Sequence, residues 1–102
     1  MIAQPELLPY TAMANAAECF KVLAHPVRLR IVDILTQSTF PVNEIARMCE
    51  LPPSQTCEHL RLLRGQGLLD SEREGRQVFY RISDLRLPSL ITCVRKHCSN
   101  ES

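Results

Sequence analysis

Apolar residues recur at helical spacing along most of the chain, and this spacing changes to strand-like alternation once, after residue 67. Residues 12–24 carry an apolar stripe with a period of about 3.6 residues and contain many strong helix formers. His25 is expected to help end this helix, and Pro26 is suited to the first position of a second helix over residues 26–37. The residues of the second helix that we expect to be buried are Val27, Leu29, Ile31, Ile34 and Leu35.

Two shorter helices follow a loop that we place at residues 37–41. The third helix begins at residue 42 and ends at 48 or 49, after which residues 50–53 form a turn. The apolar side of the third helix consists of Val42, Ile45, Ala46 and Cys49. The fourth helix begins at Ser54, directs Leu60 and Leu63 toward the core, and ends at the Gly65-Gln66-Gly67 break.

Residues 68–70 and 78–82 are expected to pair as a β-hairpin around the charged turn at Glu74-Gly75-Arg76. Pro88 then opens a last helix that runs to about Cys98. The order ααααββα describes a mainly α fold with a β-hairpin wing, which is a winged helix-turn-helix. We expect an N-terminal arm over residues 1–11, one domain over 12–98 and a short tail over 99–102.

Composition limits the class of protein. A chain of 102 residues with 45% hydrophobic residues suits one globular domain. The sequence has no apolar run near the roughly 20 residues that cross a bilayer and no charged-then-apolar leader, which predicts a soluble, cytoplasmic protein. Five cysteines without a short-spaced framework predict free thiols in a reducing compartment. A net charge of +1 predicts that any DNA binding depends on a local arrangement of cations, doubled by dimerisation.

Three consecutive segments resemble the ArsR/SmtB family of bacterial repressors, and together they cover about residues 18–97. They are LAHPVRLRIVDIL, VNEIARMCELPPSQTCEHLRLLRGQGLL and REGRQVFYRISD. Their most specific parts are His25-Pro26-x-Arg28, His59-Leu60-x-x-Leu63-Arg64 and Gly75-Arg76-x-Val78-x-Tyr80. The resemblance implies a homodimer, held by the first and last helices, that binds a double-stranded DNA operator and releases it when an inducer binds.

The fourth helix and the hairpin provide the candidate DNA contacts. With Leu60 and Leu63 inward, the opposite side of the helix is polar, and residues at its start reach base edges most easily. An arginine there can reach a phosphate or a guanine, and the arginines of the wing suit phosphate or the minor groove. The candidates are Ser54, Gln55, Cys57, Glu58, His59, Arg61, Arg73 and Arg76. The alternatives are a solvated polar surface, an ordinary charged turn and, for His59, a packing role.

Two metal sites that the resemblance implies can be compared with this chain. The third-helix site uses a Cys-x-Cys-Asp type box, and residues 41–44 contain no thiol at the matching place. The last-helix site matches Asp84, Arg86, His97 and Asn100, so two of four ligands remain and a cation replaces one. This set argues against a tetrahedral zinc site.

The remaining thiols predict a soft or oxidising effector, because thiolates bind soft metals and arsenite and react with oxidants and sulfur species. In some relatives, a thiol of the fourth helix binds arsenic with first-helix thiols of the other subunit, which permits a Cys19 and Cys57 pair. Others use a dithiol that includes a cysteine at the end of the last helix, which Cys98 matches. The second cysteine of that dithiol lies in helix two, and its position here is occupied by Asp33. Cys93 and Cys98 are about 140° apart on a helix, whereas Cys93 and His97 share a face. The candidates are Cys19, Cys57, Cys93, His97 and Cys98, while Cys49 is expected in the core.

The sequence therefore predicts a dimeric repressor that a thiol-reactive inducer such as arsenite releases from DNA, with no resident cofactor. The alternatives are a redox-sensing or reactive-sulfur-sensing repressor and a winged-helix protein-interaction module, and inert thiols stay an option throughout. An enzyme is not expected, because the sequence has no paired carboxylates, no Ser/His/Asp ordering and no phosphate loop.

Overall fold

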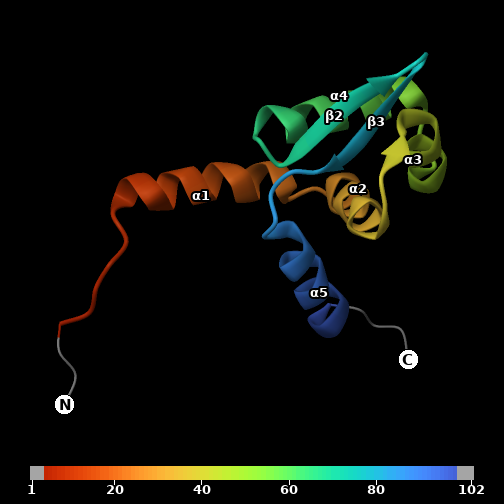
Figure 1. The fold of residues 1–102 in the computed structure, drawn as a ribbon. Helices are drawn as coiled ribbons and strands as arrows, with labels where there is room; N and C mark the ends of the chain where they lie inside the picture. Colours follow the sequence, from red (N-terminus) through yellow and green to blue (C-terminus); the bar gives the residue numbers. More distant parts are fainter. Residues whose placement is uncertain (1–3, 99–102) are drawn as a thin grey trace.

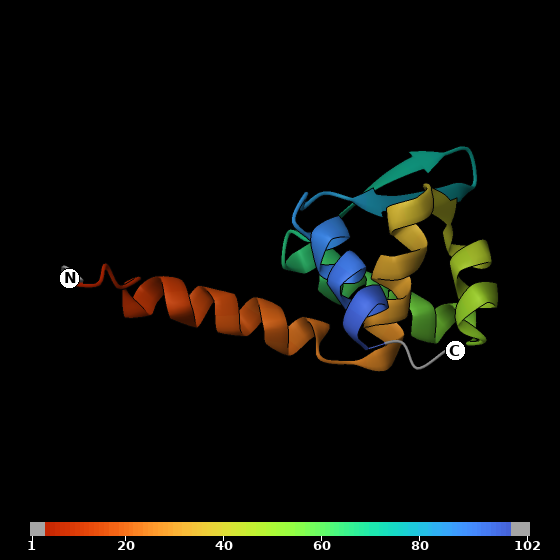
Figure 2. The same cartoon turned by 90° about the horizontal axis from the view of Figure 1, so that it is seen from below.

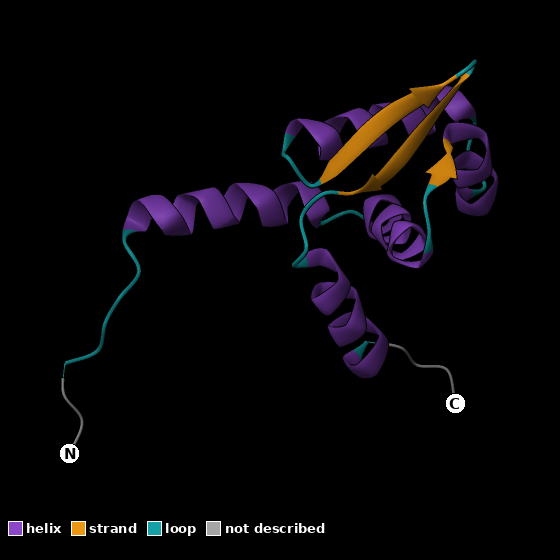
Figure 3. Cartoon of the chain, viewed as in Figure 1, coloured by secondary structure: helices purple, strands orange, loops and turns teal. Residues whose placement is uncertain are grey.

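The computed structural model describes residues 4–98 as five helices and a three-stranded sheet (Figures 1 and 3). The elements are α1 (Tyr10–Leu23), α2 (Pro26–Gln37), β1 (Phe40–Pro41), α3 (Val42–Cys49), α4 (Pro53–Gly65), β2 (Leu69–Glu74), β3 (Gln77–Ile82) and α5 (Leu87–His97). The winged helix-turn-helix order is confirmed, with one strand added between α2 and α3. The predicted tail at 99–102 and the first three residues of the arm lie outside the described residues.

The added strand corrects the predicted loop at residues 37–41. Phe40 pairs with Tyr80 and Pro41 with Phe79, so the antiparallel sheet has the order β1-β3-β2. A two-residue edge strand that contains proline has no alternating pattern of its own. Its existence depends on β3, which lies about forty residues further along the chain, and local sequence therefore does not indicate it.

The hairpin is longer than predicted, because β2 continues through the polar stretch to Glu74 and β3 begins at Gln77. Gly75 and Arg76 remain as a two-residue turn between the paired residues Glu74 and Gln77. Gly75 has φ +64, and a positive φ is what the favoured two-residue hairpin turns require at their first central residue. This turn determines the register of the wing.

The core lies between the sheet and the helices, and its fully buried side chains come from α2, α3, α4 and the start of the wing. They are Ile31, Val32, Ile45, Thr56, Leu60, Leu63 and Leu68. Val27 and Leu29 are only half-buried, which corrects the prediction for α2. Val32 was not expected in the core, and it is buried because α2 packs against α3, α4, α5 and β3 on several sides.

Three helix starts differ from prediction, and one capping role was not predicted. The helix α1 begins at Tyr10, two residues into the expected arm, and α4 begins at Pro53 rather than Ser54. The last helix starts one residue before Pro88. The helix α1 ends at Leu23, and His25 also caps the start of α2, because its Nδ1 accepts a hydrogen bond of 3.2 Å from the Val27 amide.

The first helix projects from the rest of the molecule, as Figure 2 shows most clearly. Leu23 is its one buried residue, while Tyr10 is 91% and Phe20 62% exposed. The radius of gyration is therefore 16.1 Å, against about 13 Å for a compact domain of 100 residues. Cys19, Val22 and Leu23 pack against the core, whereas Met13, Ala16, Ala17 and Phe20 of the predicted apolar stripe are exposed. None of the helices over residues 4–98 is both long enough and apolar enough to traverse a bilayer.

Candidate nucleic-acid interface

The helices α3 and α4 form a tight helix-turn-helix. Glu50 ends α3 in the left-handed conformation, with φ 58, and its amide donates to the Arg47 carbonyl over 3.1 Å. The next amide, that of Leu51, donates to Ala46 over 3.1 Å. The chain therefore reverses within four residues and enters α4 through Pro52 and Pro53, whose fixed φ suits a helix start.

The fourth helix has one buried and one polar side. Thr56, Leu60 and Leu63 follow each other at helical spacing and are fully buried. Thr56 was not among the predicted core residues, although its spacing from Leu60 and Leu63 indicates the same side of the helix. Its hydroxyl donates to the Pro52 carbonyl over 3.1 Å, which satisfies the buried oxygen. The exposed side carries the predicted Ser54, Gln55, Glu58 and Arg61.

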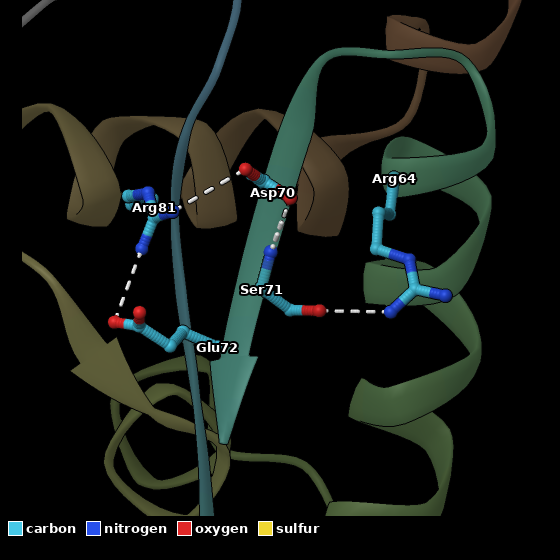
Figure 4. A network of polar contacts seen from close by, with 5 residues as sticks. All are labelled: Arg64, Asp70, Ser71, Glu72 and Arg81. Atoms are coloured by element: carbon cyan, nitrogen blue, oxygen red, sulfur yellow. Dashed lines mark hydrogen bonds and ion pairs between the residues drawn. The ribbon is translucent and has the colours of Figure 1, made fainter. Parts of the chain in front are cut away.

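A polar network connects α4 to the wing (Figure 4). Arg64, in the last turn of α4, donates from Nη1 to Ser71 Oγ of β2 over 2.8 Å. Arg81 of β3 pairs with Asp70 at 3.3 Å and with Glu72 at 3.6 Å, both on β2. The helix and both long strands are therefore held in a fixed relation. None of these five residues was a predicted site residue, because the network joins elements that periodicity treats separately.

Some arginines of this region have polar partners within the protein, and others have none among residues 4–98. Arg64 and Arg81 are bound to neighbours, and Arg47 pairs with Glu44 at 2.7 Å. Arg61, Arg73 and Arg76 are exposed, and none of them has a carboxylate of residues 4–98 within 4 Å. Three of the predicted DNA contacts thus keep uncompensated positive charge on α4 and the wing.

Two predicted residues of α4 are less accessible than expected. Cys57 is half-buried rather than exposed. His59 is half-buried against His25, with ring centroids 4.8 Å apart, and its Nδ1 accepts from Arg28 Nε over 3.1 Å. Burial and the neighbouring His25 and Arg28 lower the pKa of His59. The geometry of His59 is that of a packing residue at the junction of α2 and α4.

The predicted thiols are spread over the molecule. Cys19 is half-buried on α1, and Cys93 and Cys98 are exposed on and just after α5. Cys49 is in the core as predicted, and burial raises the pKa of its thiol. Within residues 4–98 of one chain, no three His, Cys, Asp or Glu side chains come together to hold a metal ion.

Two of the four positions that match the last-helix metal site, Asp84 and Arg86, form an ion pair with each other. Arg86 holds the Asp84 carboxylate from Nε at 3.0 Å and from Nη2 at 2.6 Å, while its amide donates to the same group. These hydrogen bonds lower the pKa of Asp84 to about 2. Asp33, at the position that matches the dithiol partner in helix two, pairs with Arg95 of α5. Asn100 lies outside the described residues.

A winged helix-turn-helix with a polar outer helix and free cations on its wing belongs to a class of nucleic-acid-binding folds. A family model described as a helix-turn-helix domain matches residues 23–72. The "HTH-type transcriptional repressor SmtB" of Mycobacterium tuberculosis is 31% identical over 94 residues, which cover 92% of this chain and 70% of that protein.

Two solved structures are also similar. Reduced HlyU from Vibrio cholerae has a TM-score of 0.81 and 30% identity, and the match covers 88% of this chain and 96% of that one. The homodimeric winged helix-turn-helix domain of Mb0332 from Mycobacterium bovis has a TM-score of 0.78 and 27% identity, with 95% and 90% covered. The chain belongs to the ArsR/SmtB family of helix-turn-helix transcriptional repressors. It is a DNA-binding transcriptional regulator.

Proposed function

We propose that this protein is a dimeric, sequence-specific repressor in which α4 enters the major groove and the wing contacts the DNA backbone. The observation that carries the proposal is the set of three exposed arginines without carboxylate partners on α4 and the wing. Arg73 and Arg76 suit phosphate contacts, and Arg61 suits a phosphate or a guanine. Ser54, Gln55 and Glu58, at the start of the same helix, suit base edges.

The uncovered side of α1 supports a homodimer. Tyr10, Met13 and Phe20 are exposed, and an isolated helix of 14 residues is marginal in water. A cavity of about 430 Å³ lies between this helix and the start of α5, lined by Ala16, Phe20, Leu87 and Leu90 among others. The first helix of a second copy fits this apolar surface, and Mb0332 is described as homodimeric. Two copies also double the local positive charge, which a chain of net charge +1 needs.

We further propose that a thiol-reactive inducer, such as arsenite, releases the DNA. Cys57 lies between Gln55 and Arg61 on the helix that is proposed to enter the groove, and it is half-buried. A group bound to its sulfur would stand between α4 and the bases. Cys19 on α1 is the candidate second thiol, contributed by the other subunit. The second candidate is a redox or reactive-sulfur response, supported by the two exposed thiols Cys93 and Cys98.

The test is a gel-shift titration of the full chain against a palindromic operator and a random duplex, with sedimentation to measure subunit number. The proposal expects a dimer that prefers the palindrome. Arsenite, zinc, mercury, persulfide and peroxide are then added to separate the inducer classes. Cys57→Ser is expected to keep DNA binding and to lose release by arsenite, whereas Cys98→Ser is the matched control. A monomer that binds both duplexes equally contradicts the DNA-binding proposal, and an arsenite-responsive Cys57→Ser protein contradicts the role of Cys57.

A further inference from the structure

One side chain, Arg28, joins three helices. Arg28 belongs to α2 and is half-buried. Its Nε donates to His59 Nδ1 of α4 over 3.1 Å, and its Nη1 donates to the Val22 carbonyl of α1 over 3.0 Å. A guanidinium is planar and rigid, so the directions of its donors are fixed relative to each other. The guanidinium of Arg28 therefore connects the end of α1 to α4 and constrains the angle between the two helices.

Both acceptors of Arg28, the Val22 carbonyl and His59 Nδ1, are suited to a stable hydrogen bond. Val22 lies in the last turn of α1, where carbonyl groups have no partner within the helix and carry partial negative charge. His59 must present an unprotonated Nδ1, because Arg28 can only donate. His25 packs against the His59 ring and caps α2 with its own Nδ1, so the ring has little freedom to turn away.

The other contacts that determine the direction of α1 come from Cys19, Val22 and Leu23, which pack against the core near the end of the helix. Leu23 is its one buried residue, and the connection to α2 consists of Ala24 and His25 alone. The His25 amide donates to the Leu23 carbonyl over 2.7 Å, which fixes the short link but not the position of α4. Arg28 provides the hydrogen-bonded path from the helix proposed to hold the dimer to the helix proposed to enter the groove.

We propose that Arg28 is a positioning residue that fixes the separation and rotation of the two α4 helices in the dimer, and so selects the spacing of the operator half-sites. This inference rests on the proposed function. Moving one half-site by one base pair displaces it by about 3.4 Å along the duplex and about 35° around it. A dimer with a fixed angle between α1 and α4 cannot follow that change without strain, whereas a dimer with a loose angle can.

The experiment measures affinity for three palindromes, with the preferred half-site spacing and with one base pair removed or added. The proteins are the wild type, Arg28→Met, Arg28→Lys and the control Arg30→Met. Arg30 is the exposed neighbour on the same helix and pairs with Glu50 at 3.8 Å. The readout is the ratio of affinities between spacings, which a smaller folded fraction does not change.

We expect the wild type and Arg30→Met to prefer one spacing by about tenfold or more, equivalent to about 1.4 kcal/mol. Arg28→Met should reduce this preference to about threefold or less, and Arg28→Lys, which loses the rigid fork, should reduce it in part. Undiminished preference in Arg28→Met overturns the inference, and so does a wild type that binds all three spacings equally. A wild type that binds no palindrome overturns the proposed function itself.

A second pair of variants tests the same contact from α4. His59→Asn keeps an acceptor oxygen near the place of Nδ1, whereas His59→Leu removes it. The inference expects the spacing preference to survive in His59→Asn and to be lost in His59→Leu. Equal preference in the two variants contradicts it, and this comparison also decides the question where Arg28→Met does not fold.

Discussion

Arg64 Nη1 lies 2.8 Å from Ser71 Oγ, and this contact joins the last turn of α4 to the first half of β2 in the wing. Arg81 continues the connection by pairing with Asp70 and Glu72 on either side of Ser71 (Figure 4). These contacts connect the surface proposed to contact the major groove with the surface proposed to contact the DNA backbone. Arg64 and Arg81 make these contacts within the protein. Among residues 4–98, the arginines that stay free to contact DNA are Arg61, Arg73 and Arg76.

Removal of the Ser71 hydroxyl tests this connection. Ser71→Ala is expected to cost about 1 kcal/mol of unfolding free energy, because a hydrogen bond to a charged group is lost. DNA affinity should fall several-fold, since the wing no longer has a fixed position relative to α4. Urea unfolding and a gel shift measure the two effects. Ser89→Ala, which changes an exposed serine on α5, is the matched control. Equal DNA affinity in both variants would mean that the polar network does not contribute to DNA binding.

Arg76 at the turn of the wing has a predicted sequence-independent role. Arg76→Ala should weaken binding to all duplexes by a similar factor and lower the slope of log affinity against log salt by about 1, because one phosphate contact is lost. Lys96→Ala removes one exposed cation from α5 and serves as the control. An unchanged salt slope in Arg76→Ala would remove Arg76 from the interface.

Gln55 is expected to affect base preference rather than overall affinity. An amide side chain at the start of α4 can make paired hydrogen bonds to one base, and its loss should reduce discrimination at one operator position by about 1–3 kcal/mol. Binding to a panel of single-base operator variants measures this change for Gln55→Ala. If every operator variant weakens equally, Gln55 contacts the backbone and not a base.

The Asp84 carboxylate provides a prediction about pH. Its pKa is about 2 in the folded protein, against an ordinary value of 3.8 for an aspartate, because Arg86 donates hydrogen bonds to it, so folding favours the charged form. The resulting stability is complete above about pH 4 and is lost as pH falls toward 2. Its size is small because Arg86 is 86% exposed. In a carboxyl NMR titration, Arg86→Ala should raise the midpoint of Asp84 toward 3.8 without reaching it, because the backbone donor remains.

An unchanged Asp84 midpoint in Arg86→Ala would mean that the side chains do not pair in solution. The same variant removes the cation from the position that matches a ligand of the family's last-helix metal site. Calorimetry with zinc alone, on the wild type and on Arg86→Ala, therefore also tests whether Arg86 prevents zinc binding at Asp84.

Much of the site was predictable because it depends on local periodicity. Leu60 and Leu63 are buried as predicted, so Ser54, Gln55, Glu58 and Arg61 are on the opposite, exposed side. Cys57 and His59 were placed less well, since they lie at the border between the two sides. Whether a border residue is covered depends on neighbours such as His25 and Arg28, which are about thirty residues earlier in the chain.

By itself, the sequence determined the order of helices and hairpin, the inward residues Leu60 and Leu63 of α4 and the polar side of the same helix. Those features follow from spacing within a few residues, where backbone geometry fixes which side chains share a face. The tertiary structure alone decided the pairing of Phe40 with Tyr80, the Arg28 junction, the Arg64 to Ser71 contact and the uncovered side of α1. The pairing of Phe40 with Tyr80 and the contact of Arg28 with His59 join residues that are distant in the chain. Arg64 and Ser71 are close in the chain, but they lie on a helix and a strand whose relative position is set only when the core packs. The uncovered side of α1 likewise follows from where the other elements lie.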